Sequence, residues 1–178
     1  MKEITNLEIG SLRVVEDTVF QNCTIGRLVC FADTKVILKD CEIKHVTGFG
    51  DLQISKTNIM DLGDSIHVIE MDSCSCVSIN GHATIDRLSN CSVQNIQEKV
   101  TVKLVTDCII GSISGIVRVV NVERSSVADF CGHSLINKIK ESSVGVVGAD
   151  AKIMVASDTS FKHVEDRKRI KALVAASA

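Results

Sequence analysis

The sequence predicts an all-β fold: a right-handed, single-stranded parallel β-helix of about ten 17-residue coils, with a C-terminal capping helix. Three observations support this prediction. The chain repeats itself about every 17 residues, apolar residues within each repeat are spaced two apart, and proline is absent from all 178 residues.

The repeat is clearest when a row is started at each cysteine that follows Asn, Asp or Ser. An earlier row starts near Thr5, and the spacing between later starts is 18, 17 and 16 residues and then a constant 17. These later starts are Cys23, Cys41, Asn58, Cys74, Cys91, Cys108, Ser125, Ser142 and Thr159. The rows cover nearly the whole chain, so the repeat defines its organisation.

Apolar residues recur at fixed positions within the rows. The second residue after the row start is Ile25, Ile43, Met60, Cys76 or Val93, and the eleventh is Leu52, Ile69, Ile85 or Val102. The fifth is also apolar, except where the rows place Gly10 and Gly63. A spacing of two indicates strands, and a helical hairpin repeat would need about 33 residues. Each row is therefore expected to form one coil with short strands and tight corners.

The composition agrees with stacked coils. Proline would remove an N–H group that the neighbouring coil needs, and a narrow interior favours small branched side chains over Trp and Tyr, which are also absent. Sugars and bases stack on large aromatic faces, so a lectin or glycanase is disfavoured. A formal charge of −2 gives no general attraction to nucleic acid or anionic membrane, and we predict neither as a partner.

The polar start at Met1–Thr5 is unlike a signal peptide, and we expect a cytoplasmic protein with reduced thiols, in the cell or associated with a virion. We assign residues 1–162 to the solenoid and residues 163–178 to a helix that caps the stack or contacts a partner. In that segment acids precede bases, Ile170, Leu173 and Val174 have helical spacing, and Arg167–Arg169 would form a solvated face. The N-terminal end, Lys2–Leu12, is the less obviously capped one.

The eight cysteines raise the question of zinc or disulfides. The closest pairs are Cys74 with Cys76, and Cys23 with Cys30, and no C-x-x-C motif occurs. Stacking would bring Cys74, Cys91 and Cys108 near disulfide distance. The column is nevertheless typical of core packing, because free cysteine behaves as a small hydrophobe. We therefore predict no metal and no cofactor.

Several residues are candidates for catalysis, because many β-solenoids cleave polysaccharides. Asp33 and Asp51 both lie ten residues into their rows and should be neighbours, and Asp61 and Asp64 share one coil. The five histidines are His45, His67, His82, His133 and His163. His82 and His133 share a position but lie three coils apart, too far to share a metal. No complete acid and base set results.

Three short motifs are further candidates for a functional site. Cys131-Gly132-His133 and Arg169-Ile170-Lys171 resemble fragments of the polygalacturonase pattern, without its paired aspartates or tyrosine. Gly111–Gly115 is rich in glycine and serine but lacks the lysine of a phosphate loop. We therefore predict no catalytic, cofactor-binding or metal-binding residues.

The stretch Ile79-Asn-Gly-His-Ala-Thr-Ile-Asp-Arg-Leu-Ser-Asn-Cys91 resembles a row of the C-terminal β-helix domain of cyclase-associated proteins. Asp40-Cys41, Asn90-Cys91 and Asp107-Cys108 repeat the end of that motif. The resemblance implies actin-monomer binding and dimerisation through a strand-exchanged end. It assigns no functional residue to this sequence.

The sequence as a whole favours a non-enzymatic structural or protein-interaction module, a rigid rod whose lateral faces and ends serve assembly or partner binding. Its partner would be a protein, including a second copy of the chain. Two alternatives remain: an actin-binding regulator of the cyclase-associated type, and a polysaccharide lyase or hydrolase.

Overall fold

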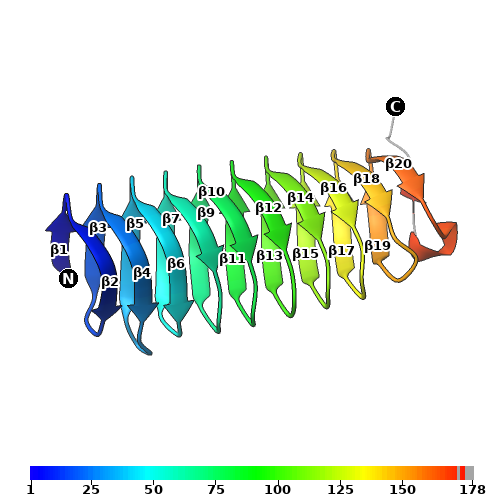
Figure 1. Cartoon of the computed structure of the whole chain (residues 1–178). Coiled ribbons are helices and arrows are strands. Elements are labelled where there is room, and N and C mark those ends of the chain that lie inside the picture. The colour runs from blue at the N-terminus through cyan, green and yellow to red at the C-terminus, as the bar shows by residue number, and fades with distance from the viewer. Residues whose placement is uncertain (172, 175–178) are drawn as a thin grey trace.

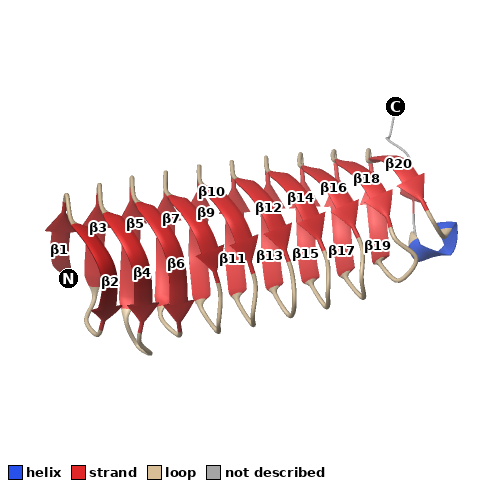
Figure 2. Ribbon diagram, in the orientation of Figure 1, coloured by secondary structure: helices blue, strands red, loops and turns tan. Residues whose placement is uncertain are grey.

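Two parallel sheets, wound as stacked coils, form the fold (Figures 1 and 2). The computed structural model describes residues 1–171 and 173–174. Within them, eleven odd-numbered strands form one sheet, here called sheet A, and ten even-numbered strands form the other, sheet B. Neighbouring strands in a sheet are two apart in chain order, so each coil gives one strand to each sheet. The predicted parallel β-solenoid of about ten coils is confirmed.

The strands are short and regularly placed along the chain. Sheet A contains β1(Lys2–Thr5), β3(Thr18–Gln21), β5(Lys35–Lys39), β7(Asp51–Ser55), β9(His67–Asp72), β11(Thr84–Ser89), β13(Thr101–Thr106), β15(Arg118–Glu123), β17(Leu135–Lys140), β19(Lys152–Ser157) and β21(Leu173–Val174). Sheet B contains β2(Glu8–Val14), β4(Thr24–Cys30), β6(Glu42–Gly48), β8(Asn58–Leu62), β10(Ser75–Ile79), β12(Ser92–Ile96), β14(Ile109–Ile113), β16(Ser126–Phe130), β18(Ser143–Val147) and β20(Ser160–Val164).

The core is a set of columns that run the length of the rod. Equivalent residues of successive coils pair in register, as Ile79 does with Ile96 between β10 and β12. Each inward side chain therefore packs on the equivalent side chains one coil above and below. The resulting core is continuous from Val14 to Ala156 and consists mainly of Ile, Val, Leu and Cys.

The structure corrects the row that the sequence starts at Asn58. Thr57 occupies the corner position: its side chain is fully buried, and its Oγ1 accepts the backbone N–H of Cys41 at 3.3 Å. Asn58 begins β8 and is exposed. The correction moves the inward positions by one residue, so Ile59 is buried and Met60 is 52% exposed.

The same correction accounts for the apparent exceptions in the repeat. Leu62 and Val68, not Gly63 and Ile69, occupy the two apolar columns and are fully buried. The first coil also differs: Glu8 pairs with Thr24, so Leu7, not Thr5, is equivalent to Cys23. Gly10 is then exposed and Leu12 takes the apolar position.

The first three coils have a different cross-section from the others. Their sheet-B strands β2, β4 and β6 have 7 residues, whereas the later ones have 5. The additional inward residues are Val14, Cys30 and Gly48, all buried. A Cβ at Gly48 would lie 1.9 Å from the Cys30 carbonyl oxygen, so this extra column ends at a glycine. A register shift between β7 and β9, at Leu52/Gln53, marks the change of cross-section.

The predicted helix over residues 163–178 is wrong for the residues that the structure describes. β20 extends to Val164, a 3-10 turn covers Arg167–Arg169, and Ile170 forms a parallel bridge with Ile153. β21 then pairs with β19 through Leu173 and Ala156. Ile170 fits both the 17-residue repeat and a helical spacing, and backbone pairing with the preceding coil determines the outcome. Residues 172 and 175–178 of the predicted helix lie outside the described part.

Burial of the columns leads to a stability prediction. Val102 lies in β13 and is fully buried. Replacing it with Asp places an unpaired carboxyl group between two apolar neighbours, which should cost on the order of 4 kcal/mol or more. Urea unfolding followed by circular dichroism measures this cost. The exposed Gln94→Asp variant should unfold like the wild type, and equal midpoints for both variants would contradict the assigned columns.

Candidate functional site

The corner that joins sheet A to sheet B has one fixed backbone conformation. In every coil one residue there has a left-handed φ between 45° and 55°. These residues are Asn6, Asn22, Asp40, Lys56, Ser73, Asn90, Asp107, Arg124, Glu141 and Asp158. Asn and Asp tolerate this conformation best, which explains their frequency, but the last coils also use Arg and Glu.

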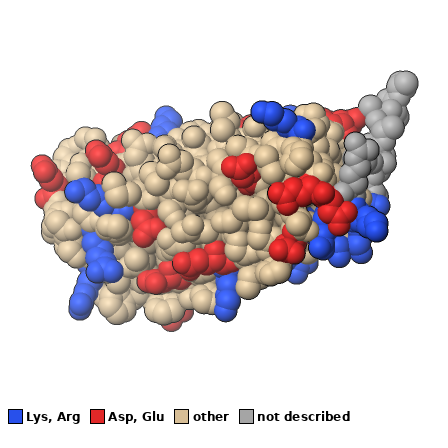
Figure 3. All heavy atoms as spheres, turned by 45° about the vertical axis from the view of Figure 1, so that its right-hand side comes forward, with Lys and Arg blue, Asp and Glu red and all other residues tan. Residues whose placement is uncertain are grey.

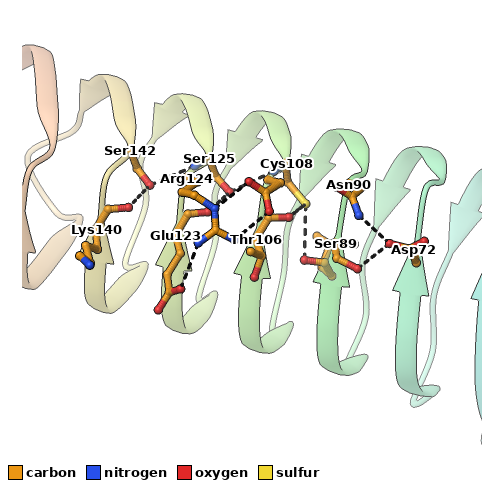
Figure 4. Close-up of polar contacts among 12 residues, drawn as sticks. Asp72, Ser89, Asn90, Thr106, Cys108, Glu123, Arg124, Ser125, Lys140 and Ser142 are labelled. Carbon is orange, nitrogen blue, oxygen red and sulfur yellow. Dashed lines mark hydrogen bonds and ion pairs between the residues drawn. The ribbon is translucent and has the colours of Figure 1, made fainter.

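From the second coil onward, the next residue in the chain is the Cys, Ser or Thr of the column, and its side chain has a defined role; in the first coil this residue is Leu7. In nine coils its Sγ or Oγ donates a hydrogen bond to the carbonyl oxygen two residues earlier, at 2.6–3.3 Å. In five coils the same atom also accepts the backbone N–H of the column residue in the preceding coil, as Ser125 does from Cys108 at 3.0 Å. Figure 4 shows this part of the column.

The column thus does more than pack. It satisfies a backbone carbonyl and a backbone N–H that the corner removes from the sheet ladders. Cysteine, serine and threonine each have a hydrogen-bonding atom attached to Cβ. Their alternation at this one position of the repeat is the sequence feature that indicates hydrogen bonding to the corner backbone. Within the column, contact with Cys108 and Cys74 together with burial raises the pKa of the Cys91 thiol, whereas the hydrogen bond with Cys91 lowers the pKa of Cys74 and Cys108. Outside the column, burial raises the pKa of Cys30 and Cys76 to about 12.

Outside this column, polar side chains connect neighbouring coils (Figure 4). Asp72 accepts hydrogen bonds from Ser73, Ser89 and Asn90, which hold the pKa of its carboxyl group below its usual range. Arg124 makes a bidentate ion pair with Asp107 at 2.8 and 2.9 Å. Arg124 and Asp107 border an open hollow of about 440 Å³ that contains hydroxyl groups and charges of both signs. Because these polar groups bind one another, we assign them to coil–coil cohesion.

One histidine forms a bridge across three coils on the outer face of sheet A. Its Nδ1 lies 2.9 Å from Asp51 Oδ1 and its Nε2 lies 3.2 Å from Asp86 Oδ2, and Lys103 reaches the same Asp86 carboxylate at 2.7 Å. Partial burial lowers the pKa of this residue, His67, but the two carboxylates outweigh that effect and raise it overall. Both ring nitrogens are occupied, so this cluster holds the coils together and presents no free ligand atom.

The carboxylates considered for catalysis are not arranged as the sequence indicated. Asp33 and Asp51 are not in register with one another: Asp33 lies in a turn with a left-handed φ of 62°, and Asp51 pairs with Lys35 and His67. The 18-residue second row caused the error. Asp61 accepts a hydrogen bond from Asn80 at 2.6 Å and lies 3.6 Å from His45, whereas Asp64 is a corner residue with φ 62°.

The motifs that resemble other proteins also have local explanations. Gly132, with φ 67°, stacks on Gly115 in the second corner, where a Cβ would lie 2.6 Å from the Gly115 backbone nitrogen. His133 follows it, as His82 follows Gly81 three coils earlier. His163 lies in the last strand of sheet B, β20. Arg169 lies near Asp150 and Asp166 at 3.9 and 3.7 Å, and residues 111–113 belong to strand β14.

No metal site and no membrane-spanning helix emerge from the described part of the chain. There, no three or more His, Cys, Asp or Glu side chains are grouped so that they could hold an ion. All eight cysteines are free. Within the same residues, no helix has the length and apolar character needed to cross a membrane.

The feature that most resembles a binding site is the N-terminal end of the rod. Ile4, Leu7, Ile9 and Leu12 continue the core columns but are only partly buried, whereas their equivalents one coil further on are at most 1% exposed. The backbone is open as well. Thr24 N–H bonds to Leu7, so the equivalent N–H of Glu8 points away from the stack. Charged side chains of both signs lie around this end, at the left in Figure 3.

In comparisons with known proteins, no family model, no curated protein and no solved structure matches this chain. The fold and the surfaces described above are therefore the basis for any functional assignment.

The corner column yields a prediction about side-chain chemistry. Cys91→Ser keeps a donor and an acceptor and should remain near wild-type stability, because Ser125 makes the same contacts two coils further on. Cys91→Ala leaves the Cys74 N–H and the Ser89 carbonyl without these partners and should cost about 1–3 kcal/mol more. Chemical unfolding under reducing conditions compares the two variants. Equal stability of Ala and Ser at this position would show that the column only fills space.

The histidine bridge yields a prediction about pH. The folded-state pKa of His67 is raised, so its contribution is complete below the unfolded pKa of about 6.5 and is lost as pH rises through the folded pKa. Because the ring is partly exposed, the contribution should be at most about 0.5 kcal/mol. His67→Gln should therefore lower the melting temperature at pH 5.5 but not at pH 8.5. His82→Gln, whose ring lies at a corner, is the control, and a pH-independent effect of His67→Gln would refute the assignment.

Proposed function

We propose that the chain is a non-enzymatic structural and protein-interaction module. It is a stiff rod that binds a protein partner through its N-terminal end, and the partner that we propose first is a second copy of the chain. The observation that carries this proposal is the exposure of core columns at that end. Ile9 and Leu12 are partly exposed although Ile25 and Leu28, their equivalents in the next coil, are 1% and 0% exposed. Exposed apolar columns next to unpaired strand edges are typical of a surface that another chain covers.

The non-enzymatic part of the proposal is supported by how the polar clusters are used. Asp51 and Asp86 both bind His67, Asp107 binds Arg124, and Asp72 is held by Ser89 and Asn90. Each cluster joins residues of different coils and lies on an exposed outer face. Such pairs support the stack, and each of these carboxylates is already held by a cation or by hydrogen-bond donors, whereas hydrolysis would need a free acid and base that face one substrate.

A reducing location, the cytoplasm or a particle assembled there, belongs to the same proposal. The thiols of Cys91 and Cys108 donate hydrogen bonds to Ser89 and Thr106 at 3.0 and 3.1 Å. A disulfide has no S–H group to donate. Oxidation of this column would therefore leave corner carbonyls unpaired, which favours a compartment that keeps thiols reduced.

The two alternatives have less support. The pairs Asp40-Cys41, Asn90-Cys91 and Asp107-Cys108, on which the resemblance to cyclase-associated proteins depends, are left-handed residues followed by corner donors. Any solenoid with this corner would select them, so they give no separate reason to expect actin binding. The carboxylate pair that the sequence offered for polysaccharide cleavage, Asp33 and Asp51, is out of register, because Asp51 pairs with Lys35.

The proposal is tested by its assembly in solution. Wild-type protein should show concentration-dependent association in sedimentation velocity. Leu12→Lys places a charge on the open end and should weaken association about tenfold or more, because the charge loses water when the end is covered. Val77→Lys, at a 43% exposed position on the outer face of sheet B, should associate like the wild type.

Circular dichroism of each variant checks that it folds, and Ile9→Lys provides a second substitution at the same end. A wild-type protein that stays monomeric at high concentration would refute self-association. If Val77→Lys abolishes association and Leu12→Lys does not, the association surface is the lateral face and the proposed end is refuted.

A further inference from the structure

We infer that the occupant of the open end is a second copy of this chain, bound through antiparallel pairing of β2 with β2 of the copy. This inference rests on the proposed function, because it specifies the partner and the geometry of the same end. Its basis is a pattern in Leu7–Val14 that reads alike in both directions.

The first part of the pattern is burial. From residue 7 to residue 13, exposed and partly buried positions alternate around a central break, where Gly10 and Ser11 are both exposed. Leu7, Ile9, Leu12 and Val14 are the inward positions, placed symmetrically about that break. If the strand is turned end for end, inward residues again meet inward residues. Antiparallel pairing about the break therefore opposes Ile9 with Leu12 of the copy, and Leu7 with Val14 of the copy.

The second part is charge. The same pairing opposes Glu8 with Arg13 of the copy, and Arg13 with Glu8 of the copy, because an isologous contact occurs twice. Both side chains are exposed, and among the described residues neither lies within 4.0 Å of an oppositely charged group in its own chain. Small residues, Gly10 and Ser11, oppose one another at the centre. Opposite charges directly across an antiparallel pair stabilise it.

The third part is backbone orientation. In β4, Thr24 and the following corner residue Phe31 both direct their N–H groups toward the first coil, to the carbonyls of Leu7 and Val14. Their equivalents in the first coil are Glu8 and Val15, whose N–H groups therefore face the open end. Hydrogen-bonding groups thus point outward on both sides of the central break, as pairing with a reversed copy requires.

A comparison within the chain shows that these charges are not needed by the coil itself. β4 has the same inward positions, but Thr24 and Val29 stand where β2 has Glu8 and Arg13. β6 again has an acid at the Glu8 position, Glu42, but Thr47 at the Arg13 position, so among the first three coils only β2 carries the two opposite charges together. They also oppose the parallel alternative, in which Glu8 would meet Glu8 and Arg13 would meet Arg13.

The opposite end is a poorer partner for β2. A head-to-tail stack would place β2 beside β20, where Phe161, Lys162 and His163 precede Val164. The inward residues of the late coils are three apart in sheet A, as Ile153 and Ala156 are, but those of the early coils are two apart, as Thr18 and Phe20 are. Within the chain this mismatch needs the register shift between β7 and β9. A closed dimer avoids the mismatch because identical coils meet.

The experiment is a charge exchange measured by sedimentation velocity and by mass after chromatography. Glu8→Arg and Arg13→Glu should each weaken dimerisation about tenfold or more, since each single variant opposes two pairs of like charges. The double variant should dimerise like the wild type. A mixture of the two single variants should form a heterodimer, because the arginines of one variant then meet the glutamates of the other in both pairs. Lys39→Glu and Glu42→Arg, exposed charges away from the end, provide matched controls.

The outcomes separate this inference from the proposed function. A monomeric wild type refutes both. A wild-type dimer that Leu12→Lys disrupts, but that neither charge variant weakens, refutes only the antiparallel pairing. A broad series of species growing with concentration indicates a head-to-tail stack and likewise overturns it. Circular dichroism confirms that each variant folds, and a folded mixture of single variants without heterodimer contradicts the inference directly.

Discussion

Everything in this molecule depends on the parallel, in-register hydrogen bonding between one coil and the next. Each residue lies beside its equivalent in the next coil at a rise of about 4.8 Å, so every column must consist of side chains that pack well or bond well against others of the same kind. Aliphatic columns form the core, as in the pairing of Ile79 with Ile96, and the backbone N–H groups of the interior coils are committed to neighbours. This commitment explains why the chain has no proline. It also means that the stack cannot end without leaving columns and hydrogen-bonding groups uncovered.

The corners show how the same constraint acts on polar residues. A left-handed residue turns the chain from sheet A to sheet B, and the residue after it must satisfy the backbone groups that the turn exposes. Cys91 does this by donating to Ser89 and by accepting from Cys74. Pairs such as Asn90-Cys91 therefore have a local physical cause. The geometry of the corner is enough to explain why they recur, without common ancestry or a shared activity. The bridges of His67 and Arg124 add cohesion between coils on the outside.

The coil number, the strand spacing and most core residues could be predicted from the sequence because the repeat samples the same column many times. The errors arose at positions where a single coil departs from the repeat, so that the other coils give no guide to its structure. Thr57 and Asn58 are both polar, so the corner residue is distinguished by the hydrogen bonds that Thr57 makes with the Cys41 N–H and the Ser55 carbonyl. Ile170 fits a helix and a strand equally well until its pairing with Ile153 is seen. The sequence predicted that the N-terminal end is weakly capped. The symmetry of Leu7–Val14 could not be predicted, because it depends on the change in side-chain direction at Gly10 and Ser11, which only the structure shows.

The central claim is that the backbone and columns of the first coil are completed by another chain. Hydrogen exchange measured by mass spectrometry at increasing protein concentration tests it most directly. Residues 7–15 should become protected as concentration rises, whereas residues 24–30, already paired on both sides, should be protected throughout. Exchange in residues 7–15 that stays fast at every concentration, or protection that instead rises in a lateral segment such as residues 75–79, would contradict the account.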